Sequence, residues 1–269
     1  MRGGDEEDTA RRDGRTRLWI GASLSAGAGV ELESGQGHYL RHVLRLAPGA
    51  AVALFNARDG EWRAVIDGFA KDRCRLVVDS RRRAPEAPGA GLWLVFAPLK
   101  RARLETLIEK ATELGVTRLV PVVTRHTDIG RVNLERLGAI AREAAEQCER
   151  LTVPELLPPT PFFQLLSHWP GLPLLVCAEA GPVRPLAAAV AALPPGPAAV
   201  LIGPEGGFAN SELDELGRRP FVVQVGLGPR VLRAETAALA ALACWQALRG
   251  DWSDDTGAEV RPPFRAGPS

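Results

Sequence analysis

From Leu92 to Leu248, short and continuously apolar runs alternate with longer segments in which apolar residues recur every three or four positions. Apolar runs of this length, alternating with amphipathic helices, are typical of a parallel sheet that helices cover on both faces. The chain is therefore predicted to carry an α/β domain over residues 92–249. The expected strands are Leu92–Phe96, Thr117–Thr124, Pro173–Ala178, Ala198–Ile202 and Phe221–Val225. The expected helices are 100–114, 134–148, 185–193 and 234–248, with a short one after Phe208 capped by Ser211.

Residues 17–83 have a different pattern, with β-prone runs at Ala51–Phe55, Glu61–Ile66 and Cys74–Val78 separated by turn-forming residues. A small barrel of five or six strands is the architecture that this pattern favours. One short helix is expected at His38–Arg45, with Leu40, Val43 and Leu44 on its inner face. Residues 84–91 have the composition of a linker, and residues 1–16 and 250–269 are expected to be disordered ends.

Several protein classes are excluded by composition. No run approaches the roughly 18–20 uncharged apolar residues of a membrane span, and the N-terminus has no apolar stretch of the kind found in secretory signals. The four cysteines lie far apart, without the spacing of a zinc site or a disulfide framework. These observations predict a cytoplasmic protein with reduced thiols and no metal.

The net charge of +1 hides an uneven distribution. Residues 11–84 contain 14 basic and 8 acidic residues, whereas residues 85–249 contain 16 of each. Only three of the 33 basic residues are lysines. Arginine suits phosphate and base edges, but a GC-rich genome would produce the same bias. Composition alone therefore gives only weak support for an RNA partner.

Two glycine-containing loops, Ile202–Phe208 and Gly226–Thr236, follow predicted strands. In α/β sheets, ligands bind at the carboxyl ends of the strands, and glycine lets the backbone approach a ligand closely. Neither loop has the GxxxxGK[ST], GxGxxG or GxSxG pattern. The pair suits an adenosine-like ligand held through backbone groups, and the alternative is two tight turns without a ligand.

Six motifs occur in order along the chain: Pro98–Glu105, Glu109–Val116, Pro121–Arg125, Glu143–Arg150 with Val153-Pro154, Ile202–Phe208 and Leu227–Ala237. Together they resemble the RsmE family of SPOUT methyltransferases, and the resemblance covers nearly all of residues 17–249. His38–Leu46 is similar to the family's N-terminal motif. The chain departs from the family after Arg125, where His126 stands in place of a serine that is common there.

The resemblance implies a PUA-like RNA-binding barrel over residues 17–83 and a SPOUT domain with a deep trefoil knot over residues 92–249. It implies a homodimer that methylates N3 of a uridine in 16S ribosomal RNA of the small subunit, with S-adenosyl-L-methionine as cofactor. The cofactor-binding residues carried over are Leu201, Ile202, Gly203, Pro204, Glu205, Gly206, Gly207, Val225, Gly226, Leu227, Gly228, Val231 and Leu232. A third segment, Cys177–Glu179 with Ala178 at its centre, is carried over from the end of an earlier strand.

Methyl transfer to N3 requires alignment of the two reacting atoms and removal of the N3 proton. Glu205 is a candidate base and Arg233 a candidate for stabilising charge on the uracil, ahead of Arg230. Glu205 could instead fix the glycine loop by accepting backbone N–H groups. Glu235 is better explained as an acid at a helix N-terminus.

Seven basic residues are candidates for RNA contact, because phosphate binding needs positive charge. Simple solvent exposure is the alternative for them. Two other functions stay open: methylation of another RNA or of a ribose 2′-hydroxyl, and an RNA-binding role in ribosome assembly without catalysis. The seven residues are Arg17, His38, Arg41, Arg45, Lys100, Arg103 and Arg125.

Overall fold

The computed structural model describes residues 16–70, 73–86, 91–127, 132–177 and 183–252. The chain divides into two compact units. In described residues, the first unit contains 16–86 and 145–152, and the second contains 91–144 and 153–252 with the gaps given above. Residues 145–152 thus belong to the first unit although they lie far along the chain from its other residues.

The first unit is built on a five-stranded sheet in the order β1-β3-β4-β5-β2. β1 is parallel to β3, and the other neighbours are antiparallel. The three strands predicted at 51–55, 61–66 and 74–78 are confirmed, but β4 and β5 pair well beyond the predicted runs. The strands are β1 (Arg17–Trp19), β2 (Gly29–Leu32), β3 (Ala51–Asn56), β4 (Gly60–Ala70) and β5 (Arg73–Arg83).

The helical segment of this unit differs from the prediction. Helix α2 (Ser34–His38) runs into a π-helical turn, η1 (Tyr39–Val43), and the N–H of Leu44 donates to the carbonyl of Tyr39 at 3.0 Å. The wider turn of a π-helix brings Leu44 rather than Val43 onto the inner face with Leu40. Leu40 is fully buried and Val43 is 60% exposed, so the predicted inward position of Val43 is wrong.

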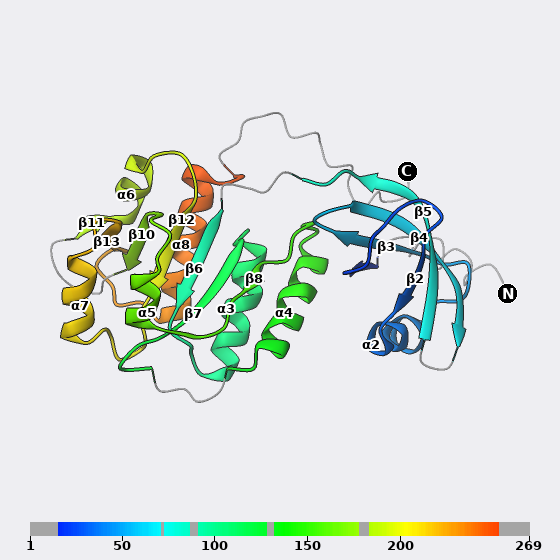
Figure 1. Cartoon of the computed structure of the whole chain (residues 1–269), viewed down its shortest axis with the longest axis horizontal. Helices are drawn as coiled ribbons and strands as arrows, with labels where there is room; N and C mark the ends of the chain where they lie inside the picture. Colours follow the sequence, from blue (N-terminus) through cyan, green and yellow to red (C-terminus); the bar gives the residue numbers. More distant parts are fainter. Residues whose placement is uncertain (1–15, 71–72, 87–90, 128–131, 178–182, 253–269) are drawn as a thin grey trace. The chain divides into compact units, whose positions relative to one another are not determined.

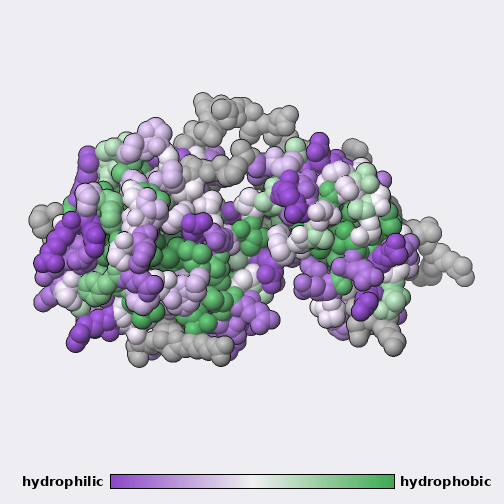
Figure 2. Space-filling model, viewed as in Figure 1, coloured by the Kyte–Doolittle hydropathy of each residue, from purple (hydrophilic) through white to green (hydrophobic). Residues whose placement is uncertain are grey.

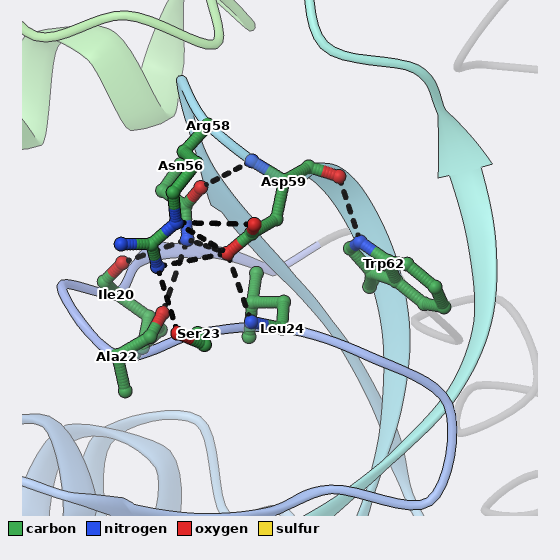
Figure 3. Close-up of polar contacts among 8 residues, drawn as sticks. All are labelled: Ile20, Ala22, Ser23, Leu24, Asn56, Arg58, Asp59 and Trp62. Atoms are coloured by element: carbon green, nitrogen blue, oxygen red, sulfur yellow. Dashed lines mark hydrogen bonds and ion pairs between the residues drawn. The ribbon is translucent and has the colours of Figure 1, made fainter.

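The turn between β3 and β4 is tied to the loop after β1 (Figure 3). The Asp59 carboxylate accepts the N–H of Leu24 at 2.9 Å and a side-chain N–H of Asn56 at 3.1 Å. The Asn56 amide also donates to the carbonyls of Ile20 and Ala22. The Arg58 guanidinium, followed by the hydrogen bonds that Asp59 accepts from Leu24 and Asn56, holds the pKa of Asp59 well below its usual range.

Arg17 lies inside the first unit, which contradicts the predicted RNA contact. Its side chain is 2% exposed, and its Nε donates to Oε2 of Glu61 at 2.8 Å. Its remaining donors reach the backbone carbonyls of Ala145, Glu146 and Arg150 at 3.0–3.3 Å. A guanidinium enclosed in this way has no face left for a phosphate.

The second unit is built on a sheet in the order β11-β13-β10-β12-β6-β7-β8, with β9 also paired to β7. The pairings in this sheet are parallel. The predicted parallel sheet is therefore confirmed. The strands are β6 (Leu92–Phe96), β7 (Arg118–Val123), β8 (Glu155–Leu156), β9 (Thr160–Pro161), β10 (Leu174–Cys177), β11 (Arg184–Pro185), β12 (Ala198–Ile202) and β13 (Val222–Gly226).

Helices cover this sheet on both faces (Figure 1). Alternate residues of β12 separate the faces: Val200 and Ile202 pack with α3, α4, α6 and α8, whereas Leu201 packs with α5 and α7. The four long helices predicted in this region are confirmed to within two residues. The helices are α3 (Arg101–Glu113), α4 (Leu134–Gln147), α5 (Phe162–Ser167), α6 (Leu186–Ala192), α7 (Asn210–Gly217) and α8 (Ala234–Arg249).

The predicted cap of α7 is wrong by two residues. The N-cap is Ala209, and Ser211 lies within the helix. The Glu212 carboxylate, three residues after the cap, accepts the Ala209 N–H at 2.8 Å. Glu212 therefore satisfies the helix N-terminus that Ser211 was expected to cap.

Hydrophobic residues also reach the surface of the second unit, where Figure 2 shows them gathered on one face with hydrophilic residues around them. Among the described residues, no helix is both long and apolar enough to cross a membrane.

Candidate functional site

The main cavity of the second unit lies at the carboxyl ends of β10, β12 and β13 and has a volume of about 650 Å³. The two glycine-containing loops, one after β12 and one after β13, form much of its wall, and the start of α8 completes it. The structure thus brings together loops that are more than 15 residues apart in the sequence. Nine predicted cofactor-binding residues line this cavity: Ile202, Gly203, Pro204, Glu205, Gly207, Leu227, Gly228, Val231 and Leu232.

Other predicted cofactor residues do not line the cavity. Leu201 and Val225 are fully buried in their strands. Gly206 and Gly226 allow close packing instead, since an added Cβ would lie 3.3 Å from His126 Cβ or 2.8 Å from a Val183 methyl. These residues support the two loops by packing on the side away from the cavity. Ala178 lies outside the described residues.

Sequence reasoning did not assign several residues of the wall. They come from strand ends, from α3, α7 and the beginning of α8, and from parts of the two glycine-containing loops that were not assigned to the cofactor. Strand-end residues resemble core residues in a sequence, so only their position at a carboxyl end could have identified them. Cys177, from the third segment assigned to the cofactor, also lies on the wall. The wall residues not assigned to the cofactor site by the prediction are Arg103, Val176, Phe208, Leu213, Gln224, Arg230, Arg233, Ala234 and Ala237.

Two glycines are required by the backbone conformation of the loops. Gly207 has φ +71° and Gly228 has φ +99°, values that are strained for any residue with a side chain. Gly203 is needed for a different reason, because an added Cβ would lie 2.7 Å from a ring carbon of Phe208. The Phe208 ring in turn packs on Phe162 of α5, which fixes the far side of the loop.

Glu212 connects the first glycine loop to the loop after β7. Its side chain is buried, with one oxygen accepting the N–H of Arg125 at 2.9 Å and the other accepting that of Ala209. The imidazole Nδ1 of His126 lies 3.0 Å from the carbonyl oxygen of Gly207. These contacts hold the cavity wall in one conformation, and no sequence motif indicated them.

Arg103, at the start of α3, lies on the cavity wall and forms an ion pair with Glu205. Its Nε is also 3.6 Å from Oε1 of Glu235 in the first turn of α8. Among the described residues, no backbone N–H donates to Glu205, so the structure gives no support to the loop-fixing alternative. Arg230 and Arg233 are exposed on the same wall, and no described acid forms an ion pair with them.

Cys177 ends strand β10 at the inner part of the cavity wall. Burial raises the pKa of its thiol to about 12. The described residues contain no group of three or more metal-binding side chains. The cavity wall combines the backbone of the glycine loops with apolar side chains and the charged side chains of Arg103, Glu205, Arg230 and Arg233.

The other candidate RNA residues are exposed, in two groups. Lys100 and Arg125 follow β6 and β7, so they lie at the same edge of the sheet as the cavity. In the first unit, the rings of His38 and His42 lie 4.7 Å apart, and Arg41 lies over the ring of Phe69. Arg45, just after the π-helical turn, has φ +56°.

Comparison with known families gives the class of the protein. Residues 85–246 match the model of an RNA methyltransferase domain, and residues 32–79 match that of an RNA methyltransferase PUA domain. The fold, the cavity and these matches define an RNA methyltransferase with a PUA-like domain and an α/β catalytic domain.

Individual relatives narrow that class. The chain is 33% identical to ribosomal RNA small subunit methyltransferase E of Rickettsia conorii over 84% of this chain and 93% of the relative. The enzyme of that name from Neisseria gonorrhoeae, solved with bound S-adenosyl methionine, is 29% identical, with a TM-score of 0.76 over 88% and 99% of the two chains. A Legionella pneumophila methyltransferase solved with its cofactor SAM is 30% identical, with a TM-score of 0.74 over 86% and 97%. This chain belongs to the ribosomal RNA small subunit methyltransferase E family, as its motifs predicted.

Proposed function

We propose that this protein methylates N3 of a uridine in 16S ribosomal RNA of the small subunit, with S-adenosyl-L-methionine as methyl donor. The observation that carries the proposal is the cavity between two glycine-containing loops at the carboxyl edge of the sheet. Relatives named ribosomal RNA small subunit methyltransferase E support the RNA substrate.

The cavity residues fit the cofactor. Its volume of about 650 Å³ is in the range of roughly 300–1,000 Å³ for small-molecule sites. Leu227, Leu232 and Ala237 give apolar walls for an adenine ring, and the loop backbone offers hydrogen-bonding groups near Gly203 and Gly228. Two similar structures contain this cofactor.

S-adenosylmethionine, when bound, supplies an electrophilic methyl group. The remaining work belongs to the protein, which aligns uridine N3 and removes its proton. Glu205 is the proposed acceptor of that proton. Arg233 and Arg230, which have no described acidic partner, stabilise negative charge on the uracil or hold a neighbouring phosphate.

The same proposal extends to the architecture. Residues 17–83 would form a closed PUA-like RNA-binding barrel and residues 92–249 a knotted SPOUT domain, joined by the linker 84–91. The protein would act in the cytoplasm as a homodimer. Val231 is 79% exposed and Leu213 is 41% exposed at the cavity, and apolar side chains of this kind favour burial by a second subunit. Light scattering after size-exclusion chromatography should give twice the monomer mass.

The activity is tested with purified protein, S-adenosylmethionine labelled in its methyl group, and small subunits or 16S RNA that lack the modification. Digestion to nucleosides and mass spectrometry should give labelled 3-methyluridine. Label in a 2′-O-methyl nucleoside, or only in another RNA, would favour the other methyltransferase functions. Absence of cofactor binding in calorimetry would favour a ribosome-assembly protein that binds RNA without catalysis.

A pair of variants on α8 tests the location of the cofactor. Ala237 lines the cavity and Ala240 is exposed on the same helix. Ala237→Phe should reduce the affinity for S-adenosylmethionine at least tenfold, because the ring occupies the cavity, and Ala240→Phe should leave it unchanged. Calorimetry measures both. Equal affinities in the two variants, with both folded, would place the cofactor elsewhere.

A further inference from the structure

We propose that Arg103 is a positioning residue that holds the Glu205 carboxylate against the cavity, with Glu235 as its second anchor. This inference rests on the proposed function and assigns Arg103 a role other than the RNA contact expected from the sequence. It follows from how three separate segments meet. Arg103 comes from α3, Glu205 from the loop after β12, and Glu235 from the first turn of α8.

Glu205 depends on Arg103 for its orientation. Its side chain is 43% exposed on a loop between Pro204 and Gly206, and the guanidinium of Arg103 is the partner that the described residues give it. An unrestrained glutamate on such a loop would spread over many rotamers in water. Pairing with a planar guanidinium selects one direction for the carboxylate.

Glu235 fixes Arg103 in turn. It is more enclosed than Glu205, with a side chain 18% exposed, and its Oε1 lies 3.6 Å from Nε of Arg103. Its other oxygen is buried without a hydrogen-bond partner in the described structure. A buried carboxylate oxygen in that state makes the neighbouring guanidinium important to retain. Arg103 therefore lies between two carboxylates, the largely enclosed one of Glu235 and the more exposed one of Glu205.

The local charge separates positioning from phosphate binding. Arg103 has two carboxylates beside it, so the three groups sum to −1, and a phosphate placed there would be repelled. Arg230 and Arg233 lie on the same wall without such partners among the described residues. These two arginines, rather than Arg103, are suited to the negative charge of the substrate.

The test compares Arg103→Gln, Glu205→Gln and the double variant in steady-state methylation. Each single variant should lower kcat roughly 10–100-fold, the scale on which a misplaced reacting group acts, with KM for RNA changed less than about threefold. The affinity of Arg103→Gln for S-adenosylmethionine in calorimetry should equal that of Glu205→Gln, because Arg103 acts through Glu205. The double variant should be no slower than Glu205→Gln alone, since groups that act as a unit are not additive. Arg103→Lys should recover part of the rate because it keeps one charge.

Arg118→Gln is the matched control. Arg118 forms an ion pair with Glu155, and the two side chains are 34% and 55% exposed, close to the 35% and 43% of Arg103 and Glu205. Arg118 is the first residue of β7, whereas the cavity lies at the carboxyl end of the sheet. The kcat of Arg118→Gln should therefore equal that of the wild type.

Three results would overturn the inference. One is an Arg103→Gln variant with normal kcat and a raised KM for RNA, which would indicate a substrate contact. Another is a double variant slower by the product of the two single effects. The third is a Glu205→Gln variant with full activity. Failure of the wild type to bind S-adenosylmethionine is distinguishable from all three, and it would overturn the proposed function together with this inference.

Discussion

Two arginine–glutamate pairs, one in each unit, show how burial decides what an ion pair does. The Arg17 and Glu61 side chains are 2% and 3% exposed, and backbone carbonyls satisfy the other donors of Arg17. The Arg103 and Glu205 side chains are 35% and 43% exposed at the edge of a cavity. The sequence predicts both arginines to be RNA contacts.

The difference teaches that the surroundings of a charge, rather than its residue type, determine its role. Removing one member of a buried pair leaves the other charge in a medium of low dielectric constant. Removing one member of an exposed pair leaves the other in water, at little cost in stability. The first pair should therefore matter for folding, and the second for the position of a reacting group.

The largest expected effect is on stability, from Arg17→Met. The variant removes the nearer of the two guanidinium groups beside the buried Glu61, since Nη1 of Arg83 is 3.9 Å from the same carboxylate oxygen. It also leaves three backbone carbonyls without their donor, and we expect the free energy of unfolding to fall by about 3–5 kcal/mol. Urea unfolding followed by circular dichroism measures this. Arg63→Met is the control, since its pair with Asp79 has side chains 32% and 52% exposed and should contribute less than about 1 kcal/mol.

A second variant makes the Arg17 result specific. Arg17→Met combined with Glu61→Leu removes both charges, and replacement of a buried pair by apolar residues is often neutral. The double variant should regain much of the stability that Arg17→Met removes. If Arg17→Met unfolds like the wild type but binds RNA more weakly, Arg17 is not buried in the protein in solution.

A smaller effect, on RNA affinity, is expected at the cavity wall. Arg230→Gln with Arg233→Gln should weaken RNA binding and lower the slope of log K against log salt concentration, by about 0.7–0.9 for each phosphate that is no longer neutralised. Arg103→Gln should leave that slope unchanged because Arg103 is already neutralised by its two carboxylates. Fluorescence anisotropy at several salt concentrations measures this slope for the double variant and for Arg103→Gln. A slope change for Arg103→Gln equal to that of the double variant would remove the distinction between these arginines.

The smallest effect comes from a third cluster, formed by Arg101 and Glu105 of α3 and Arg136 of α4. Arg136 and then Arg101 lower the pKa of Glu105 to about 2. Because the folded-state pKa lies below the unfolded value of roughly 4.3, the carboxylate stabilises the fold above that pH. The contribution is lost as the pH falls toward 2. Glu105→Gln should thus be slightly less stable than the wild type at pH 7 and differ less at pH 3, as measured by urea unfolding. A difference independent of pH would contradict this.

Long apolar strands and their helices were predictable because periodicity is a local property. Leu92–Phe96 and Ala198–Ile202 are strands with the predicted bounds. The two-residue strands β8, β9 and β11 are too short to show a period, and the π-helical turn at Tyr39–Val43 has no pattern that distinguishes it from an α-helix.

The sequence predicted only those parts of the site that directly follow the carboxyl end of a strand. The rule that ligands bind at such ends located the two glycine loops, because each follows a recognisable strand. The partner of Glu205 is 102 residues away in sequence, and the carbonyls around Arg17 are at least 128 residues away. Contacts at such separations depend on the assembled fold, so neither the pairing of Arg103 nor the burial of Arg17 follows from a local motif.

The thiol of Cys177 has a consequence for the durability of the protein. A thiolate is a strong nucleophile, and one beside a bound methyl sulfonium would compete with the RNA for the methyl group and would itself become a methyl thioether, with the neutral thioether of the cofactor as leaving group. Burial raises the pKa of this thiol to about 12, so near neutral pH almost every molecule keeps it protonated. If the proposed cofactor binds in this cavity, the burial of Cys177 at an apolar strand end further lowers the fraction of thiolate that could react with its methyl group.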